Sequence, residues 1–199
     1  MAHPADPSIA DSKAALRRRV VDTRRSLDPL LLGQAARGLR DVVLGLPEVQ
    51  VATRIAAYVS VGREPGTGQI LDALADRGVT VLLPVVLPDL DLDWAPYTGS
   101  KALVTATRGL LEPSAKPLGP DAVTTADVIL VPALAVDRSG YRLGQGGGCY
   151  DRALARVAGR AFTCALLHEG ELLDLPLPRD LHDVPVHAVA TPSGVQRLR

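Results

Sequence analysis

The chain is poor in cysteine and has no net charge, and each of these features disfavours a class of protein. Its two cysteines, Cys149 and Cys164, provide neither a disulfide framework nor the paired spacing of a structural zinc site, so we expect a reducing compartment. The 22 basic and 22 acidic residues leave a formal net charge of zero, which gives no overall indication of nucleic-acid binding. A disulfide-rich secreted scaffold and a basic nucleic-acid-binding protein are therefore both disfavoured.

Long apolar runs are also missing. No apolar run approaches the roughly 20 residues that a membrane span requires. The N-terminal Met-Ala-His-Pro-Ala-Asp-Pro lacks the apolar core of a signal peptide. We therefore expect a cytoplasmic monomer with neither a membrane nor a nucleic-acid partner.

The chain does contain enough apolar residues for a substantial core, since 47% of its 199 residues are hydrophobic. We expect one domain over residues 1–199, with residues 1–7 frayed. Strands that alternate with helices predict a three-layer α/β/α domain. The expected helices cover about 8–26, 29–44, 67–76 and 152–157, and the expected strands cover 54–60, 79–86, 92–97, 126–136, 161–167 and 186–191.

A glycine-rich loop follows the expected strand 126–136. Residues 142–152 read Arg-Leu-Gly-Gln-Gly-Gly-Gly-Cys-Tyr-Asp-Arg, with four glycines in the five positions 144–148. Glycine lets the backbone bend and removes side chains that would block a ligand, and amides beside a helix start can point at an anion. Arg142 adds positive charge, and the Asp151 carboxylate suits magnesium. The loop therefore predicts a site for nucleotide phosphates.

Plainer interpretations of this loop stay open. It could be a flexible turn between a strand and a helix, and Asp151 could merely favour a helix N-terminus. Known phosphate motifs fit poorly, because no lysine follows the glycines as in a P-loop, and the third glycine of a dinucleotide fingerprint would fall on Cys149.

A row of cations follows the edge of the first expected helix. Leu16 and Val20 belong to the apolar stripe, and helical geometry places Lys13, Arg17 and Arg24 beside it. A solvated basic helix is the simpler interpretation. Cations at the edge of a buried face can instead reach a ligand shared with the core, where lysine offers a point charge and arginine a bidentate fork.

Together these segments resemble the 5-formyltetrahydrofolate cyclo-ligases, also called methenyltetrahydrofolate synthetases. The similarity covers the loop 142–152, the Lys-x-x-x-Arg of Lys13 and Arg17, a glutamate after the strand 54–60, and the His-Asp-Val-Pro segment 182–185. Two positions depart from the family: Cys149 replaces a tyrosine, and His187 replaces an acid. The second departure puts in doubt an acid-dependent metal role at that position.

The resemblance implies a fold like that of the NagB, ribose-phosphate isomerase and CoA-transferase group, and it implies a set of site residues. ATP contacts are implied for Lys13, Arg17, Arg142, Leu143, Gly144, Gln145, Gly146, Gly147, Gly148, Cys149 and Tyr150. Contacts with 5-formyltetrahydrofolate are implied for Val59, Glu64, Trp94, Gly147, Gly148 and Tyr150. Lys13, Arg142 and Tyr150 are the implied catalytic residues, and Asp151 is the implied magnesium ligand.

Two of these residues have simple alternatives. Glu64 could be a solvated loop acid, although a carboxylate can accept hydrogen bonds from the amino and ring N–H groups of a pterin. Trp94 could be a core residue, although it could stack on the pterin. The segment 109–113, Gly-Leu-Leu-Glu-Pro, resembles a family loop with a possible contact to the site.

The implied reaction converts 5-formyltetrahydrofolate and ATP to 5,10-methenyltetrahydrofolate, ADP and phosphate, with magnesium. Phosphorylation would turn the formyl oxygen into a leaving group, and Cys149 would fill space, since no covalent nucleophile is required. Two rivals remain: a sugar-phosphate sensor without turnover, which would need neither Lys13 nor Glu64, and an aldose–ketose phosphate isomerase. The isomerase requires a general base for which the sequence shows no clear motif.

Overall fold

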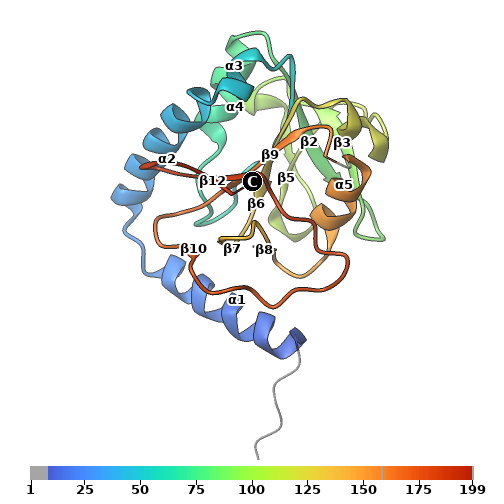
Figure 1. Ribbon diagram of the computed structural model, residues 1–199. Helices are drawn as coiled ribbons and strands as arrows, with labels where there is room; N and C mark the ends of the chain where they lie inside the picture. The colour runs from blue at the N-terminus through green and yellow to red at the C-terminus, as the bar shows by residue number, and fades with distance from the viewer. Residues whose placement is uncertain (1–8, 158, 199) are drawn as a thin grey trace, which may run out of the picture.

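A seven-stranded sheet forms the centre of the molecule, which we describe from a computed structural model over residues 9–157 and 159–198 (Figure 1). In order across the sheet, the strands are β12 (Gly194–Arg197), β11 (Ala188–Thr191), β9 (Phe162–Leu166), β6 (Val128–Pro132), β1 (Arg54–Ala56), β2 (Thr80–Val86) and β3 (Leu92–Pro96). The five inner strands pair in parallel, and the edge strands β12 and β3 pair antiparallel. Parallel strands end at the same edge, so their C-terminal loops gather there.

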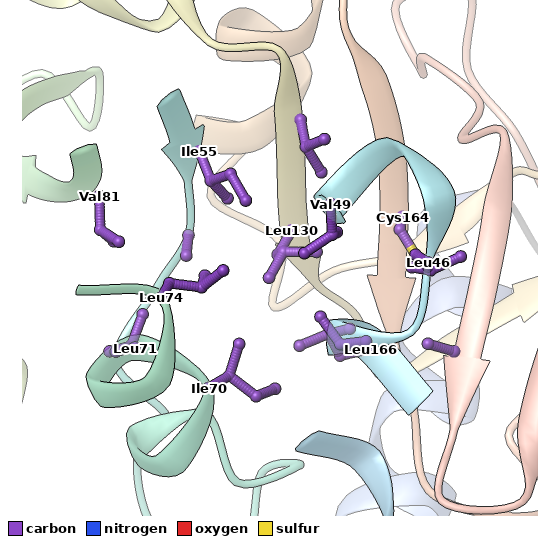
Figure 2. Packing of buried hydrophobic residues seen from close by; sticks show 14 of the residues in the cluster. Leu46, Val49, Ile55, Ile70, Leu71, Leu74, Val81, Leu130, Cys164 and Leu166 are labelled. Atoms are coloured by element: carbon purple, nitrogen blue, oxygen red, sulfur yellow. The ribbon is translucent and has the colours of Figure 1, made fainter. Parts of the chain in front are cut away.

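Helices cover both faces of this sheet. Helices α2 (Pro29–Leu44), α3 (Pro47–Val51) and α4 (Gly68–Asp76) lie on one face, and α5 (Cys149–Val157) with the 3-10 helix η3 (Pro120–Thr125) lies on the other. Successive strand residues alternate between the faces: Ile55 and Leu130 join the first core, whereas Ala56 and Ile129 join the second. Figure 2 shows the first core, where leucines of α4 meet Ile55 and Leu130. The predicted three-layer α/β/α fold is confirmed.

Helix α1 (Ile9–Arg25) packs on a separate small sheet. This sheet contains β10 (Leu172–Leu173), β7 (Ala135–Asp137) and β8 (Arg142–Leu143). Leu16, Val20 and Val21 of α1 cover a cluster of Leu134, Ala135, Leu143 and Leu177. In Figure 1 α1 runs beneath β7 and β8. Arg17 of α1 donates a hydrogen bond to the Gly144 carbonyl, so the helix reaches the start of the glycine loop.

The remaining elements are short. They are the hairpin β4 (Leu103–Thr105) and β5 (Leu111–Pro113), with the 3-10 turns η1 (Ser100–Ala102) and η2 (Thr107–Gly109). In the described part of the chain, no helix is both long and apolar enough to cross a membrane.

Several predicted boundaries were wrong. The strand expected over 126–136 is two strands in different sheets, and the break follows Pro132, whose missing N–H cannot continue a ladder. The strand expected over 54–60 ends at Ala56, and α5 begins at Cys149 instead of Arg152. The short helix α3, which Pro47 opens, was not predicted. The predicted fraying of residues 1–7 lies outside the described residues.

Candidate active site

A cavity of about 700 Å³ opens at the C-terminal edge of the parallel strands. Its wall combines α1, the loops after β1 and β6, the end of β2, and the loop between β8 and α5. Segments far apart in the sequence therefore meet around one space, at the edge where open α/β sheets commonly bind ligands.

Most of the predicted site residues lie on this wall. They are Lys13, Arg17, Val59, Glu64, Arg142, Leu143, Gly144, Gln145, Gly146, Gly147, Gly148, Cys149, Tyr150 and Asp151. The cationic helix edge, the glycine loop and the loop acid, predicted separately, thus surround a single cavity.

The glycine loop adopts a backbone that other residues would strain. Gly146 has a φ of +106° and Gly148 a φ of +67°. A Cβ built on Gly146 would lie 3.4 Å from Cζ of Arg17, whose Nε donates to the Gly144 carbonyl at 2.8 Å. Glycine lets the loop lie directly against this guanidinium, so Arg17 supports the loop and also faces the cavity.

Arg142 is held inside the wall by an ion pair. Its Nη2 donates to Oδ1 of Asp151 at 2.8 Å, and its Nη1 donates to the Val184 carbonyl at 2.9 Å. Only 8% of Arg142 is exposed. Its charge is therefore shared with Asp151 before any ligand arrives, and the pair fixes the carboxylate where α5 begins.

Lys13 forms ion pairs with the segment that follows β10. Its Nζ lies 2.8 Å from Oδ2 of Asp180 and 2.7 Å from Oδ2 of Asp183, and 8% of the residue is exposed. Burial alone would lower the pKa of Lys13, but the hydrogen bonds and charges of these carboxylates outweigh it, so the pKa is raised. Lys13 is therefore cationic, and two carboxylates already pair with its charge.

The same segment gathers possible metal ligands. One ligand atom each from Asp180, His182 and Asp183 lies within 4.8 Å of the others, and all three residues line the cavity. Burial raises the pKa of Asp183, but hydrogen bonds from Lys13 and the Asp180 amide outweigh this, so the pKa lies below its usual value. These oxygens and the Asp151 carboxylate are donors of the kind that magnesium prefers.

Glu64 sits at another part of the cavity wall. Its Oε2 accepts the Val61 amide at 3.0 Å, and its carboxylate also accepts a side-chain hydrogen bond from Gln145. Burial raises the pKa of Glu64 above its usual value, against the opposing effects of the Val61 amide and the charge of Arg24. Gln145, predicted as an ATP contact, thereby links the glycine loop to the loop acid.

Trp94 lies behind the wall and not on it. It has 0% exposure and packs edge-on against Tyr150, with ring centroids 6.4 Å apart at 84°. The antiparallel pairing of β3 with β2 buries its face of the strand in the second core. We therefore correct the prediction that Trp94 stacks on the substrate, and assign it instead as support for Tyr150.

Two further residues near the predicted motifs have structural partners. Arg24, in the cationic row of α1, donates to both carboxylate oxygens of Glu171 at 2.7 and 2.8 Å and to the Ala133 carbonyl at 2.7 Å. His187 lies outside the cavity wall, where its Nδ1 is 2.8 Å from Oγ1 of Thr163.

Some wall residues were not predicted. Tyr58 precedes Val59 in the loop after β1, and Asp180 lies two residues before the His-Asp segment, so both are close to positions that were predicted. Leu110, Leu111 and Glu112 also line the cavity, as the family-like loop 109–113 suggested they could. No sequence pattern marks Tyr58, because a tyrosine after a buried strand is usually a core residue.

Comparisons with known proteins agree with this geometry. Residues 9–192 match the 5-formyltetrahydrofolate cyclo-ligase family. The chain is 43% identical over 195 residues to the 5-formyltetrahydrofolate cyclo-ligase of Mycolicibacterium smegmatis, covering 94% of this chain and 98% of the relative. It is 30% identical over 181 residues to the Escherichia coli enzyme of that name, covering 86% and 96%.

A solved structure agrees as well. The structure of 5,10-methenyltetrahydrofolate synthetase from Aquifex aeolicus superposes with a TM-score of 0.79 at 27% identity, covering 94% of this chain and 93% of the other. Because a family match, a close relative and a similar structure each span nearly the whole chain, the chain belongs to the 5-formyltetrahydrofolate cyclo-ligase family.

Proposed function

We propose that the protein converts 5-formyltetrahydrofolate and ATP to 5,10-methenyltetrahydrofolate, ADP and phosphate. The observation that carries the proposal is one cavity lined by Lys13, the glycine loop and Glu64. Cations and backbone amides suit a triphosphate, and a half-buried carboxylate suits the N–H groups of a pterin. The names of the relatives support the same reaction.

The reaction begins with activation of the formyl group. The formyl oxygen attacks the γ-phosphorus of ATP, a new P–O bond forms, and the bond to the bridging oxygen breaks as ADP leaves. Such a transfer depends mainly on alignment and charge neutralisation. Lys13, Arg17 and the amides of residues 146–148 can supply both, and none of them needs to become a nucleophile.

Ring closure completes the reaction. The neighbouring folate nitrogen attacks the activated formyl carbon and loses its proton, and the C–O bond breaks as phosphate leaves. Glu64 fixes the pterin while Tyr150, supported by Trp94, bounds the space between the two ligands. Holding both reactants in one cavity favours the attack over loss of the intermediate to water.

The acidic residues of the wall fit magnesium. Asp151 would hold the ion, with Arg142 orienting its carboxylate, and Asp180 and Asp183 are further oxygen donors on the same wall. When bound, the ion would neutralise charge on the phosphates. Location in the cytoplasm and a monomeric state remain predictions.

The alternative, a sugar-phosphate sensor of the same fold, is less well supported. It would use the glycine loop, but it would give no reason for the half-buried carboxylate of Glu64, which interacts with that loop through Gln145. A simple assay separates the two functions: absorbance of the methenyl product with and without ATP. We expect product only with ATP, and a protein that forms none in its presence would not be a cyclo-ligase.

A further inference from the structure

The hydroxyl of Tyr58 is a buried polar group that none of the described residues pairs with. Tyr58 is 5% exposed, and its ring packs in the first core beside the residues of β1. The residue also lines the cavity. Its hydroxyl oxygen has no hydrogen-bond partner among the described residues. Buried polar groups are normally paired, so an unpaired hydroxyl at a cavity wall suggests a partner that the cavity receives.

The polar groups of three other aromatic side chains can be compared with the Tyr58 hydroxyl. The hydroxyl of Tyr97, which is also buried, donates to Oδ1 of Asp72 at 2.5 Å. The Trp94 indole nitrogen is unpaired among the described residues, but it does not line the cavity. Tyr150 is unpaired and lines the cavity, and it already has a place in the proposed site. Tyr58 therefore adds a donor that the proposed function has not used.

The charge of Glu64 acts on the Tyr58 hydroxyl. Burial, followed by the charge of Glu64 and the neighbouring Tyr150, holds the pKa of the Tyr58 hydroxyl well above its usual value. The hydroxyl thus stays protonated and can donate. The Glu64 carboxylate accepts bonds from Val61 and Gln145, and no hydrogen bond joins it to Tyr58.

The edge of a pterin presents a matching order of groups. An amino group and a ring N–H, both donors, lie beside a ring carbonyl, which is an acceptor. A carboxylate satisfies the donors, and the acceptor then needs a donor on the adjoining wall. We propose that Tyr58 donates a hydrogen bond to the pterin ring carbonyl, next to the groups that Glu64 accepts, and so contributes to selection of the folate ring. This inference rests on the proposed function.

The test removes one oxygen atom. Tyr58→Phe should weaken binding of 5-formyltetrahydrofolate about tenfold, the effect expected from one hydrogen bond to an otherwise unpaired group, and should leave ATP affinity unchanged. 5-Methyltetrahydrofolate has the same ring edge but no formyl oxygen, and its affinity should fall by the same factor. Direct titration of each ligand provides the dissociation constants.

Stability provides an independent readout. Because the Tyr58 hydroxyl has no partner in the described protein, Tyr58→Phe should leave the melting temperature unchanged or raise it. The matched control Tyr97→Phe removes a paired hydroxyl outside the cavity wall, so it should lower the melting temperature and leave both folate affinities unchanged. A lower melting temperature for Tyr58→Phe with unchanged folate binding would mean a structural role only.

The remaining outcomes are distinguishable. Equal folate affinities in Tyr58→Phe and the wild type, with folate binding weakened by Glu64→Gln, would overturn the role of Tyr58 and leave the proposed function intact. A loss confined to the formyl compound would place the hydroxyl at the formyl oxygen and overturn the assignment to the ring carbonyl. A wild-type protein that binds neither folate would overturn both proposals.

Discussion

At the scale of single residues, burial and charged partners determine the pKa values of the two main charged groups of the site, Lys13 and Glu64. Lys13 carries a buried positive charge between two acids, whereas Glu64 carries a half-buried negative charge. Asp180 and Asp183 raise the pKa of Lys13 against the effect of burial, whereas burial itself raises the pKa of Glu64. The two residues should respond to pH in different ranges.

Folate binding should weaken in mild acid because of Glu64. A raised pKa means that Glu64 takes up its proton at a higher pH than an exposed glutamate does, and protonation removes an acceptor for the pterin. The KM for 5-formyltetrahydrofolate should rise as pH falls through this pKa, while Glu64→Gln should show a high KM with no such rise. Steady-state kinetics from neutral pH down to the limit of stability measures both.

The matched control is Glu48→Gln, since Glu48 pairs with Arg197 and does not line the cavity. It should keep the wild-type pH profile. An identical pH dependence in Glu64→Gln and the wild type would assign the titration to another group.

The sequence allowed a better prediction of which residues line the cavity than of which side chains are buried. Lys13, Glu64 and the glycines could be found because their motifs are local in the chain. The burial of Trp94 and the unpaired hydroxyl of Tyr58 could not, since both depend on which strands pair and which side chains meet across the core.

At the scale of elements, glycines set how closely the segments pack. Gly140 ends the turn before β8 with a φ of +86°, and a Cβ on it would lie 2.5 Å from the Val186 carbonyl oxygen. The Gly140 carbonyl accepts the Val186 amide at 2.8 Å, so neither backbone can move away freely. This contact anchors the strand that leads into the glycine loop to the segment before β11.

We expect Gly140→Ala to destabilise the protein by at least about 2 kcal/mol, from the combined steric clash and backbone strain. Gly33→Ala is the matched control, because a Cβ on this glycine of α2 would have no atom within 4 Å. It should stabilise the protein by about 0.5–1 kcal/mol through helix propensity. Urea unfolding measures the free energy of unfolding of both variants. An unchanged free energy in Gly140→Ala would mean that the backbone contact between residues 140 and 186 can shift to accommodate a Cβ.

The order of elements could be predicted, but some of their limits could not. Helix α2 was predicted over 29–44, and it begins with a capping aspartate and a proline. The run 126–136 was predicted as one strand because it is apolar throughout, and apolarity alone cannot reveal that β7 leaves the main sheet to pair with β8 and β10.

At the scale of the whole molecule, two parts of the fold form the cavity: the main seven-stranded sheet, and helix α1 packed on the small sheet. The parallel sheet brings the loop of Glu64 and the end of β6 to one edge, as alternating strands and helices predicted. The small sheet then carries α1 across that edge, where Lys13 meets Asp180, 167 positions away in the sequence. No pattern in α1 alone could predict that meeting, because it depends on the docking of Leu16 and Val20.

The central claim is that one cavity holds a triphosphate at Lys13 and a pterin at Glu64. Its most direct test is titration of ATP with magnesium, and separately of 5-formyltetrahydrofolate, into the wild type, Lys13→Ala and Glu64→Gln, with Arg18→Ala on the exposed side of α1 as control. We predict that Lys13→Ala weakens ATP binding at least about tenfold and leaves folate binding within about twofold, a difference of about 1.4 kcal/mol or more. Glu64→Gln should do the reverse, and Arg18→Ala should change neither. Wild-type ATP affinity in Lys13→Ala, or a Glu64→Gln variant that loses ATP binding while it keeps folate binding, would contradict the account.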